Sequence, residues 1–153
     1  MHFSTEQELV ETAIRHLPLR RWLRAPDGTR IFQQTEVQGL FGIPDCLAAF
    51  TPATNGRTKP QLRRIAFEMK LSDWRRGLVQ AFRYRSFAST SFLVIDDSRS
   101  KPAVANADRF KRANIGLIGL NANGRFRVYV RPQREIPFAP HLENTLTEIV
   151  KSS

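Results

Sequence analysis

The chain has 153 residues, enough for one domain with a single core, and 41% hydrophobic with 25% charged residues is typical of a globular protein. No apolar run approaches the roughly 18 residues of a membrane span, so we expect no membrane association. The single cysteine, Cys46, excludes an intrachain disulfide and a zinc site built on several cysteines, and with no visible secretory signal it favours a cytoplasmic setting.

The charge balance is strongly basic. The chain carries 24 Lys and Arg against 14 Asp and Glu, a formal net charge of +10. A field of that sign attracts polyanions, of which nucleic acid is the commonest.

Local patterns predict the elements in chain order. A capping box of Thr5 and Glu8 begins a helix at 5–17. Strands are expected at 30–37, 46–50 and 62–70, separated by a turn at 39–42 and a polar loop from Thr51 to Pro60. A helix at 73–88 and a buried strand at 91–96 follow.

The C-terminal third is expected to add a short helix at 104–113, a β-hairpin at 115–120 and 125–130, and a last helix at 141–151. The order is therefore α-β-β-β-α-β and then α-β-β-α, which predicts an α/β fold with a mixed sheet flanked by helices. We expect a single domain over residues 1–153, with its core at about 5–96 and an extension at about 104–151.

One carboxylate and one ammonium stand out on the third strand. Glu68 and Lys70 are two residues apart, so both emerge on the face opposite Ile65 and Phe67. A carboxylate can hold Mg²⁺, and a lysine beside it can orient water or stabilise charge on a phosphate. The pair therefore suggests a phosphodiesterase site.

A second carboxylate is needed, because one alone rarely holds Mg²⁺. Asp45, after Pro44, begins the preceding strand. If the two strands pair, Asp45 and Glu68 can share one cation.

Pro44-Asp45 followed by Glu68-Met69-Lys70 resembles the signature of the PD-(D/E)XK nuclease superfamily, the restriction-endonuclease-like proteins. That superfamily has an αβββαβ core, which matches residues 5–96. Many members carry Q-x-x-x-Y on the next helix, where this chain has Gln80 and Tyr84. The resemblance implies an endonuclease with catalytic residues Asp45, Glu68, Lys70 and Gln80.

The resemblance also implies a metal site for Mg²⁺, with Mn²⁺ as a substitute. Glu6-Gln7-Glu8-Leu9-Val10 is similar to the start of the archaeal Holliday-junction resolvases, whose first glutamate joins the metal site. Glu6 is therefore expected to complete the set with Asp45 and Glu68. Glu36, at the end of the first strand, is the rival for this role, and helical geometry favours Glu6.

Basic residues suggest a nucleic-acid interface. Along the hairpin, Arg125, Arg127, Tyr129 and Arg131 alternate with apolar residues, which predicts one basic face. A solvated edge strand has the same pattern. The expected contacts to nucleic acid are Arg75, Arg76, Arg83, Tyr84, Arg125 and Arg127.

Three hypotheses follow from the sequence. The first is a Mg²⁺-dependent endonuclease acting on DNA, with RNA not excluded. The second is a catalytically inactive DNA-binding subunit of a larger DNA-processing complex. The third is an unrelated basic domain that docks on an acidic protein. A homodimer is compatible with the first, because enzymes that cut both strands often work in pairs.

Overall fold

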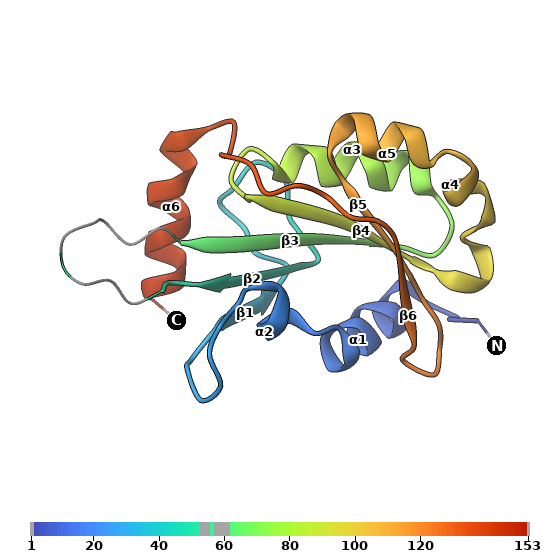
Figure 1. Ribbon diagram of the computed structural model, residues 1–153, viewed down its shortest axis with the longest axis horizontal. Helices are drawn as coiled ribbons and strands as arrows, with labels where there is room; N and C mark the ends of the chain where they lie inside the picture. The colour runs from blue at the N-terminus through green and yellow to red at the C-terminus, as the bar shows by residue number, and fades with distance from the viewer. Residues whose placement is uncertain (1, 53–55, 57–61, 153) are drawn as a thin grey trace.

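The computed structural model describes residues 2–52, 56 and 62–152, and most of the expected loop from Thr51 to Pro60 lies outside them (Figure 1). One mixed sheet of six strands runs through the molecule in the order β1-β2-β3-β4-β5-β6. The strands are β1 Phe32–Thr35, β2 Cys46–Phe50, β3 Arg63–Lys70, β4 Thr90–Asp96, β5 Gly116–Leu120 and β6 Phe126–Val130. β1, β2 and β3 are antiparallel, β3, β4 and β5 are parallel, and β6 is antiparallel to β5. The predicted mixed sheet is confirmed.

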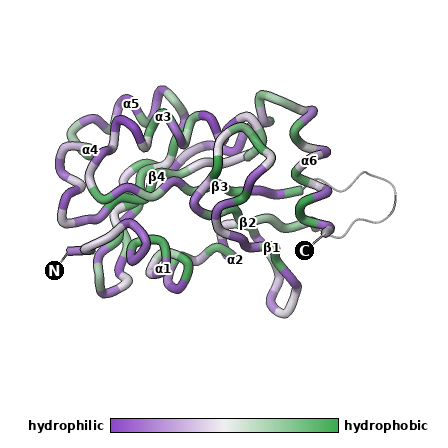
Figure 2. The backbone as a smooth tube through the Cα atoms, turned by 180° about the vertical axis from the view of Figure 1, so that it is seen from behind, coloured by the Kyte–Doolittle hydropathy of each residue, from purple (hydrophilic) through white to green (hydrophobic). Residues whose placement is uncertain are grey.

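Helices cover both faces of this sheet. They are α1 Glu6–His16, α2 Leu19–Trp22, α3 Trp74–Tyr84, α4 Lys101–Ala105, α5 Ala107–Ala113 and α6 Pro140–Lys151, with a 3-10 turn, η1, at Asp97–Arg99. Figure 2 shows α1 and α2 on one side of the sheet and α3, α4 and α5 on the other. None of the helices in the described ranges has the length and apolar character needed to cross a membrane.

The observed helices differ from the expected ones in three places. The four residues of α2 were not predicted, because so short a helix leaves no periodic signal. The helix expected at 73–88 ends at Tyr84, and the one expected at 104–113 is two short helices, α4 and α5.

Helix α1 begins as its sequence predicts. The Thr5 hydroxyl accepts a hydrogen bond from the Glu8 N–H at 3.2 Å, while Glu8 accepts one from the Ser4 N–H at 3.0 Å. Leu9, Val10 and Ala13 are then buried against the sheet. This packing fixes the start of α1 near the C-terminal end of β3, where α1 and β3 are in contact.

Strand β3 divides its side chains between the two faces of the sheet. Ile65, Phe67 and Met69 pack with α1 and α2, whereas Ala66 packs on the other face. Glu68 and Lys70 have the same parity as Ala66, so they emerge on the face covered by α3, as expected. Because β3 continues through α3 into the parallel β4, that helix lies directly above them.

Candidate active site

Three charged side chains meet at the C-terminal end of β3. The Lys70 Nζ lies 3.6 Å from Glu68 Oε1 and 3.7 Å from Glu6 Oε1. Glu68 is only 3% exposed, which is unusual for a glutamate without a special role. Strand β3 thus supplies two of these groups, and the first turn of α1 supplies the third.

Asp45 joins this cluster from the neighbouring strand. It directly precedes β2, whose Cys46 lies opposite Phe67 in the antiparallel register. Its Oδ2 accepts a hydrogen bond from the Met69 N–H at 2.7 Å, and its carboxyl lies close enough to that of Glu68 for the two to share a hydrogen bond when one of them is protonated. Strands β2 and β3 therefore pair, as the shared cation site requires, and this pairing brings the carboxyls of Asp45 and Glu68 together.

Two carboxyls in contact cannot both ionise freely. Burial and then the charge of Asp45 raise the pKa of Glu68 from 4.5 to about 7, against the opposing effects of the Tyr84 hydroxyl and Lys70. Burial also raises the pKa of Asp45, opposed first by the hydrogen bond from Met69. Near neutral pH the pair therefore shares a proton, which a divalent cation can replace.

Tyr84 fixes the position of Glu68. Its hydroxyl donates to Glu68 Oε2 and also lies 2.9 Å from the carbonyl oxygen of Ile43. Gly42, with φ of +90°, packs so closely that an added Cβ would lie 2.8 Å from the Tyr84 ring. Tyr84 is 2% exposed, so the expectation that it contacts nucleic acid is corrected: this side chain is enclosed beneath the site.

Gln80 carries an unsatisfied acceptor. Its Oε1 is buried and has no hydrogen-bond partner among the described residues. It sits on α3 one turn from Tyr84 and one turn from Gly77, where an added Cβ would lie 3.0 Å from Lys70 Cγ. A buried orphan oxygen is rare in native proteins and indicates a partner absent from the protein itself, such as a cation or a water bound to one.

Glu6 and Glu36, the two rivals for the third metal ligand, lie in different surroundings. Glu6 forms an ion pair with Lys70, and the Glu6 side chain is 44% exposed. Glu36, with φ of +51°, ends β1 as an exposed residue whose N–H reaches the Asp45 carbonyl oxygen. The structure therefore brings Glu6 to Lys70, and it leaves the side chain of Glu36 in solvent.

The residues of the site do not form a complete ligand set for a metal ion, but they fit a Mg²⁺ site that waters and substrate phosphates complete. Within the described ranges, no group of three or more His, Cys, Asp or Glu could hold a metal ion. Asp45 and Glu68 instead form an incomplete set of two carboxyls. Mg²⁺ commonly binds such sets, because it keeps several waters and uses one or two carboxylates together with substrate phosphates.

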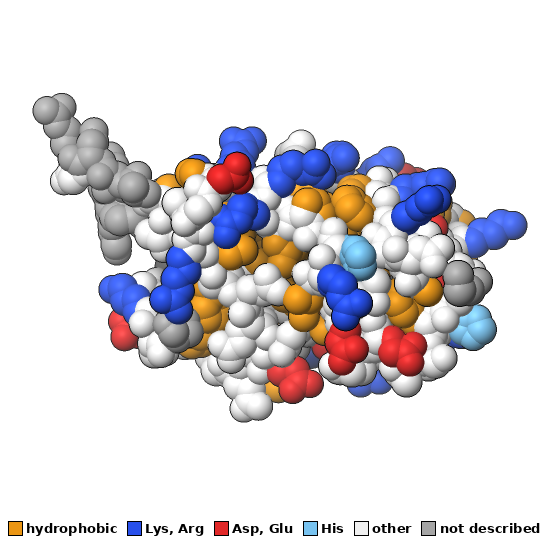
Figure 3. All heavy atoms as spheres, turned by 90° about the horizontal axis from the view of Figure 1, so that it is seen from below, with side chains coloured by type: hydrophobic (Ala, Val, Ile, Leu, Met, Phe, Trp, Pro, Cys, Tyr) orange, Lys and Arg blue, Asp and Glu red, His pale blue; other side chains and the backbone are white. Residues whose placement is uncertain are grey.

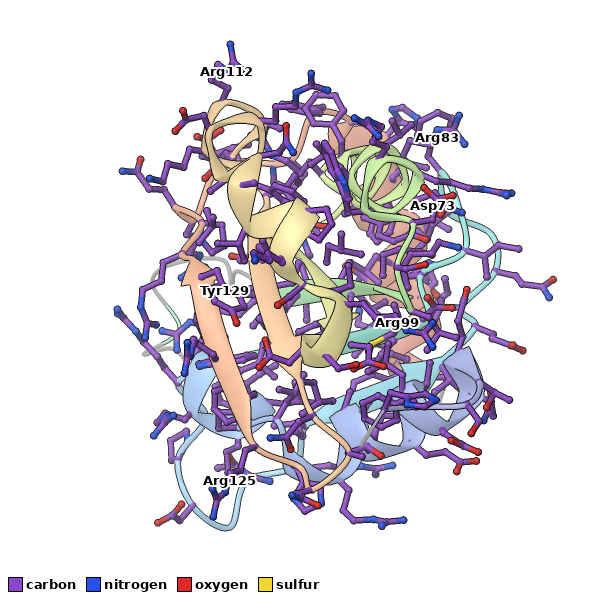
Figure 4. The ribbon with its side chains drawn as sticks, turned by 90° about the vertical axis from the view of Figure 1, so that its right-hand side faces the viewer. Asp73, Arg83, Arg99, Arg112, Arg125 and Tyr129 are labelled. Atoms are coloured by element: carbon purple, nitrogen blue, oxygen red, sulfur yellow. The ribbon has the colours of Figure 1, made fainter. Side chains whose placement is uncertain are left out.

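The predicted nucleic-acid contacts do not form one surface. Arg75, Arg76, Arg83, Arg125 and Arg127 are all exposed. Figure 4 shows Arg83 on α3 and Arg125 at the hairpin turn at opposite ends of the molecule. On the side of α1 and α2, Lys and Arg side chains gather mostly along one long edge of the face (Figure 3). The α3 arginines and the hairpin turn therefore do not belong to one patch.

The expected alternation along the hairpin is also broken. Leu117 pairs with Val130, but the next residue, Ile118, pairs with Val128, so Tyr129 is an extra residue in a β-bulge. Val130 is consequently buried on the same face of the sheet as Leu117, and Arg131 turns to the face of α2. The bulge was not predicted, because no glycine marks it in the sequence.

Comparisons with models of protein families, with curated proteins and with solved structures found no match. The likeness of Pro44-Asp45 and Glu68-Met69-Lys70 to the nuclease signature therefore remains a resemblance of motifs. What the chain does has to follow from the chemistry of its own side chains.

Proposed function

We propose that this protein is a metal-dependent endonuclease of the PD-(D/E)XK type, which hydrolyses phosphodiester bonds in DNA. The observation that carries the proposal is the contact of Asp45 with Glu68 across β2 and β3, with Lys70 beside them. Apart from the four-residue α2, the order of the elements through β4 is also the αβββαβ order of that superfamily.

Asp45, Glu68 and the Oε1 of Gln80 are the groups that would hold Mg²⁺, or Mn²⁺ in its place. When bound, the cation supplies a water of lowered pKa and polarises the scissile phosphate. The raised pKa of both carboxyls supports this assignment, since a pair that is costly to ionise alone gains most from a cation.

Lys70 would act on the phosphate and on the attacking water. Its ammonium group carries three donors, and Glu68 and Glu6 flank it. It can therefore hold the water for attack, or donate to the phosphate oxygen on which charge develops. Glu6 then serves as a positioning residue for Lys70, and Tyr84 serves as one for Glu68.

The test compares two substitutions that remove the same charge. Asp45→Asn is expected to reduce Mg²⁺-dependent cleavage of plasmid, duplex, junction and single-stranded DNA by at least about 100-fold, the usual effect of losing a central electrostatic group. It should also abolish Mn²⁺ binding in calorimetry. Asp108→Asn, at an exposed position of α5, is the control and should leave both unchanged.

Circular dichroism would establish that both variants are folded. Cleavage by Asp45→Asn at the wild-type rate would refute the proposal. DNA binding that is steeply salt-dependent and indifferent to Mg²⁺, with no cleavage by the wild type, would instead identify a DNA-binding subunit without catalysis.

A further inference from the structure

Six arginines line a cavity on the face of the sheet that carries α2, and one of them, Arg64, is itself buried and donates to the carbonyl oxygens of Phe87 and Leu62. Arg21 belongs to α2, and Arg24 follows that helix. Arg63 and Arg64 begin β3, and Arg131 and Arg134 lie in the segment after β6. The cavity has a volume of about 410 Å³. It lies at the beginnings of β3 and β4, whereas Glu68 and Lys70 lie at the other end of β3, roughly 16 Å further along the strand at 3.3 Å per residue.

The floor of this cavity is apolar and aromatic. Trp22, Ile65 and Phe92 line it, together with the polar Ser89 and Thr90. The ring of Trp22 stacks on that of Phe92 with centroids 5.3 Å apart, and Trp22 remains partly exposed. An apolar floor of this kind can take the face of a nucleobase, because every base presents a π surface.

The Arg63 side chain is oriented by uncharged groups of the backbone. The Arg63 guanidinium donates to the carbonyl oxygens of Leu23 at 3.0 Å and Arg24 at 3.2 Å, which fixes its direction without adding a negative charge. None of the described residues that line the cavity is acidic. Burial, followed by the charges of Arg63, Arg64 and Arg24, lowers the pKa of Arg134.

Two features of the backbone bring the last arginines to the rim. The bulge at Tyr129 turns Arg131 to this face of the sheet. The chain after β6 then runs back along the sheet toward α6 (Figure 1), tied by the Glu135 N–H to the Ser89 carbonyl oxygen at 3.0 Å. This tie holds Arg134, the preceding residue, over the start of β4.

We propose that this cavity binds a phosphorylated nucleotide, with its phosphate on the arginines and its base on the apolar floor. Arginine suits phosphate because its planar donors match two oxygens at once. The volume is within the range of about 300 to 1,000 Å³ of small-molecule sites. The nucleotide is either the 5′-phosphorylated end of a nucleic-acid strand or a free nucleotide. The proposal goes beyond the nuclease and does not depend on it.

Trp22 provides a reporter for the test. The chain has two tryptophans, so Trp74→Phe leaves Trp22 as the sole emitter. With EDTA present to exclude metal chemistry, this variant is titrated with a nucleoside diphosphate, pyrophosphate, and one oligodeoxynucleotide with and without a 5′-phosphate. Calorimetry on the unmodified chain with the same probes keeps the test valid if Trp74→Phe disturbs the fold.

The phosphorylated oligonucleotide or the diphosphate should quench Trp22 and bind at least about tenfold more tightly than the probe that lacks phosphate or base. A preference between these two identifies the strand end or the free nucleotide as the source. Arg131→Gln and Arg134→Gln should each weaken binding by about tenfold, the loss of one charge-assisted hydrogen bond. Arg112→Gln, at an exposed position of α5 on the opposite side of the sheet from α2, should weaken it less than about twofold because only general charge is lost.

Three results would overturn the proposal. Equal weakening by Arg112→Gln and Arg131→Gln would show attraction by net charge alone. Pyrophosphate binding as tightly as the diphosphate would remove the role of the base. The absence of quenching and of heat with every probe would leave no site. Asp45→Asn should not alter nucleotide binding at this cavity. A failure of the nuclease proposal would be seen only in the cleavage assay, and can therefore be told apart from a failure of this proposal.

Discussion

Glu68→Gln is the substitution that isolates the electrostatics of the site. It preserves the shape of a side chain that is 3% exposed and removes its charge. The glutamine oxygen can still accept from Tyr84, and its amide can donate to Asp45. Packing and hydrogen bonding therefore change little, whereas the titration of the carboxyl disappears.

The size of the effect follows from the raised pKa. The pKa of Glu68 is 4.5 in its ordinary state and about 7 in the folded chain, so the folded state binds this proton more tightly than the unfolded state. Stability is therefore lost as pH rises from 4.5 towards 7. At 1.4 kcal/mol per pKa unit, the wild type should lose about 2 kcal/mol between about pH 5 and about pH 8.5 that Glu68→Gln keeps. For a chain of this size that corresponds to roughly 4 to 8 °C in Tm.

Urea unfolding in EDTA, at both of these pH values, measures the difference. Glu11→Gln, an exposed residue of α1, is the control and should change stability by less than about 0.5 kcal/mol at either pH. Adding Mg²⁺ at the higher pH should stabilise the wild type and not Glu68→Gln. If Glu68→Gln lowers the unfolding free energy equally at both pH values, the carboxyl does not titrate as described and the reasoning fails.

Three further substitutions probe the surroundings of this carboxyl. Tyr84→Phe removes a hydrogen bond that lowers the pKa of Glu68, so the acidic limb of the pH–rate profile should move to higher pH. Gln80→Leu removes a buried oxygen without a partner among the described residues; thermal melts should show a gain of about 1 kcal/mol while cleavage falls. Gly77→Ala would place a Cβ 2.5 Å from Leu93 Cδ1, so melts should show a loss of about 1 to 3 kcal/mol despite the better helix propensity of alanine.

The sequence predicted the elements whose signals are local. The capping box at Thr5 and the alternation that separates Phe67 from Glu68 depend on neighbours within a few residues, and both are present in the structure. Helix α2 has four residues and depends on tertiary packing. Its sequence accordingly carried no periodic pattern.

The sequence predicted the two residues of β3 at the site, but not the positions of the residues that surround them. The spacing of Glu68 and Lys70 placed them on one face, but the proximity of Glu6 to Lys70 depends on how α1 packs, which no pattern records. The enclosure of Tyr84 depends on the loop at Gly42. The arginine cavity was missed because its arginines come from three separate segments, and each segment alone is an ordinary stretch of basic residues.

The bulge at Tyr129 bears on how this protein can change during evolution. Many substitutions at a bulged position leave the path of the strand intact. Losing Tyr129 would restore simple pairing, and it would leave Val130 on the face of Leu117 and Arg131 on the face of α2. The bulge thus lets β6 carry one residue more than β5 without changing the face of the arginine that follows, so homologues should differ in length by one residue at Tyr129 more readily than they lose the basic residue at Arg131.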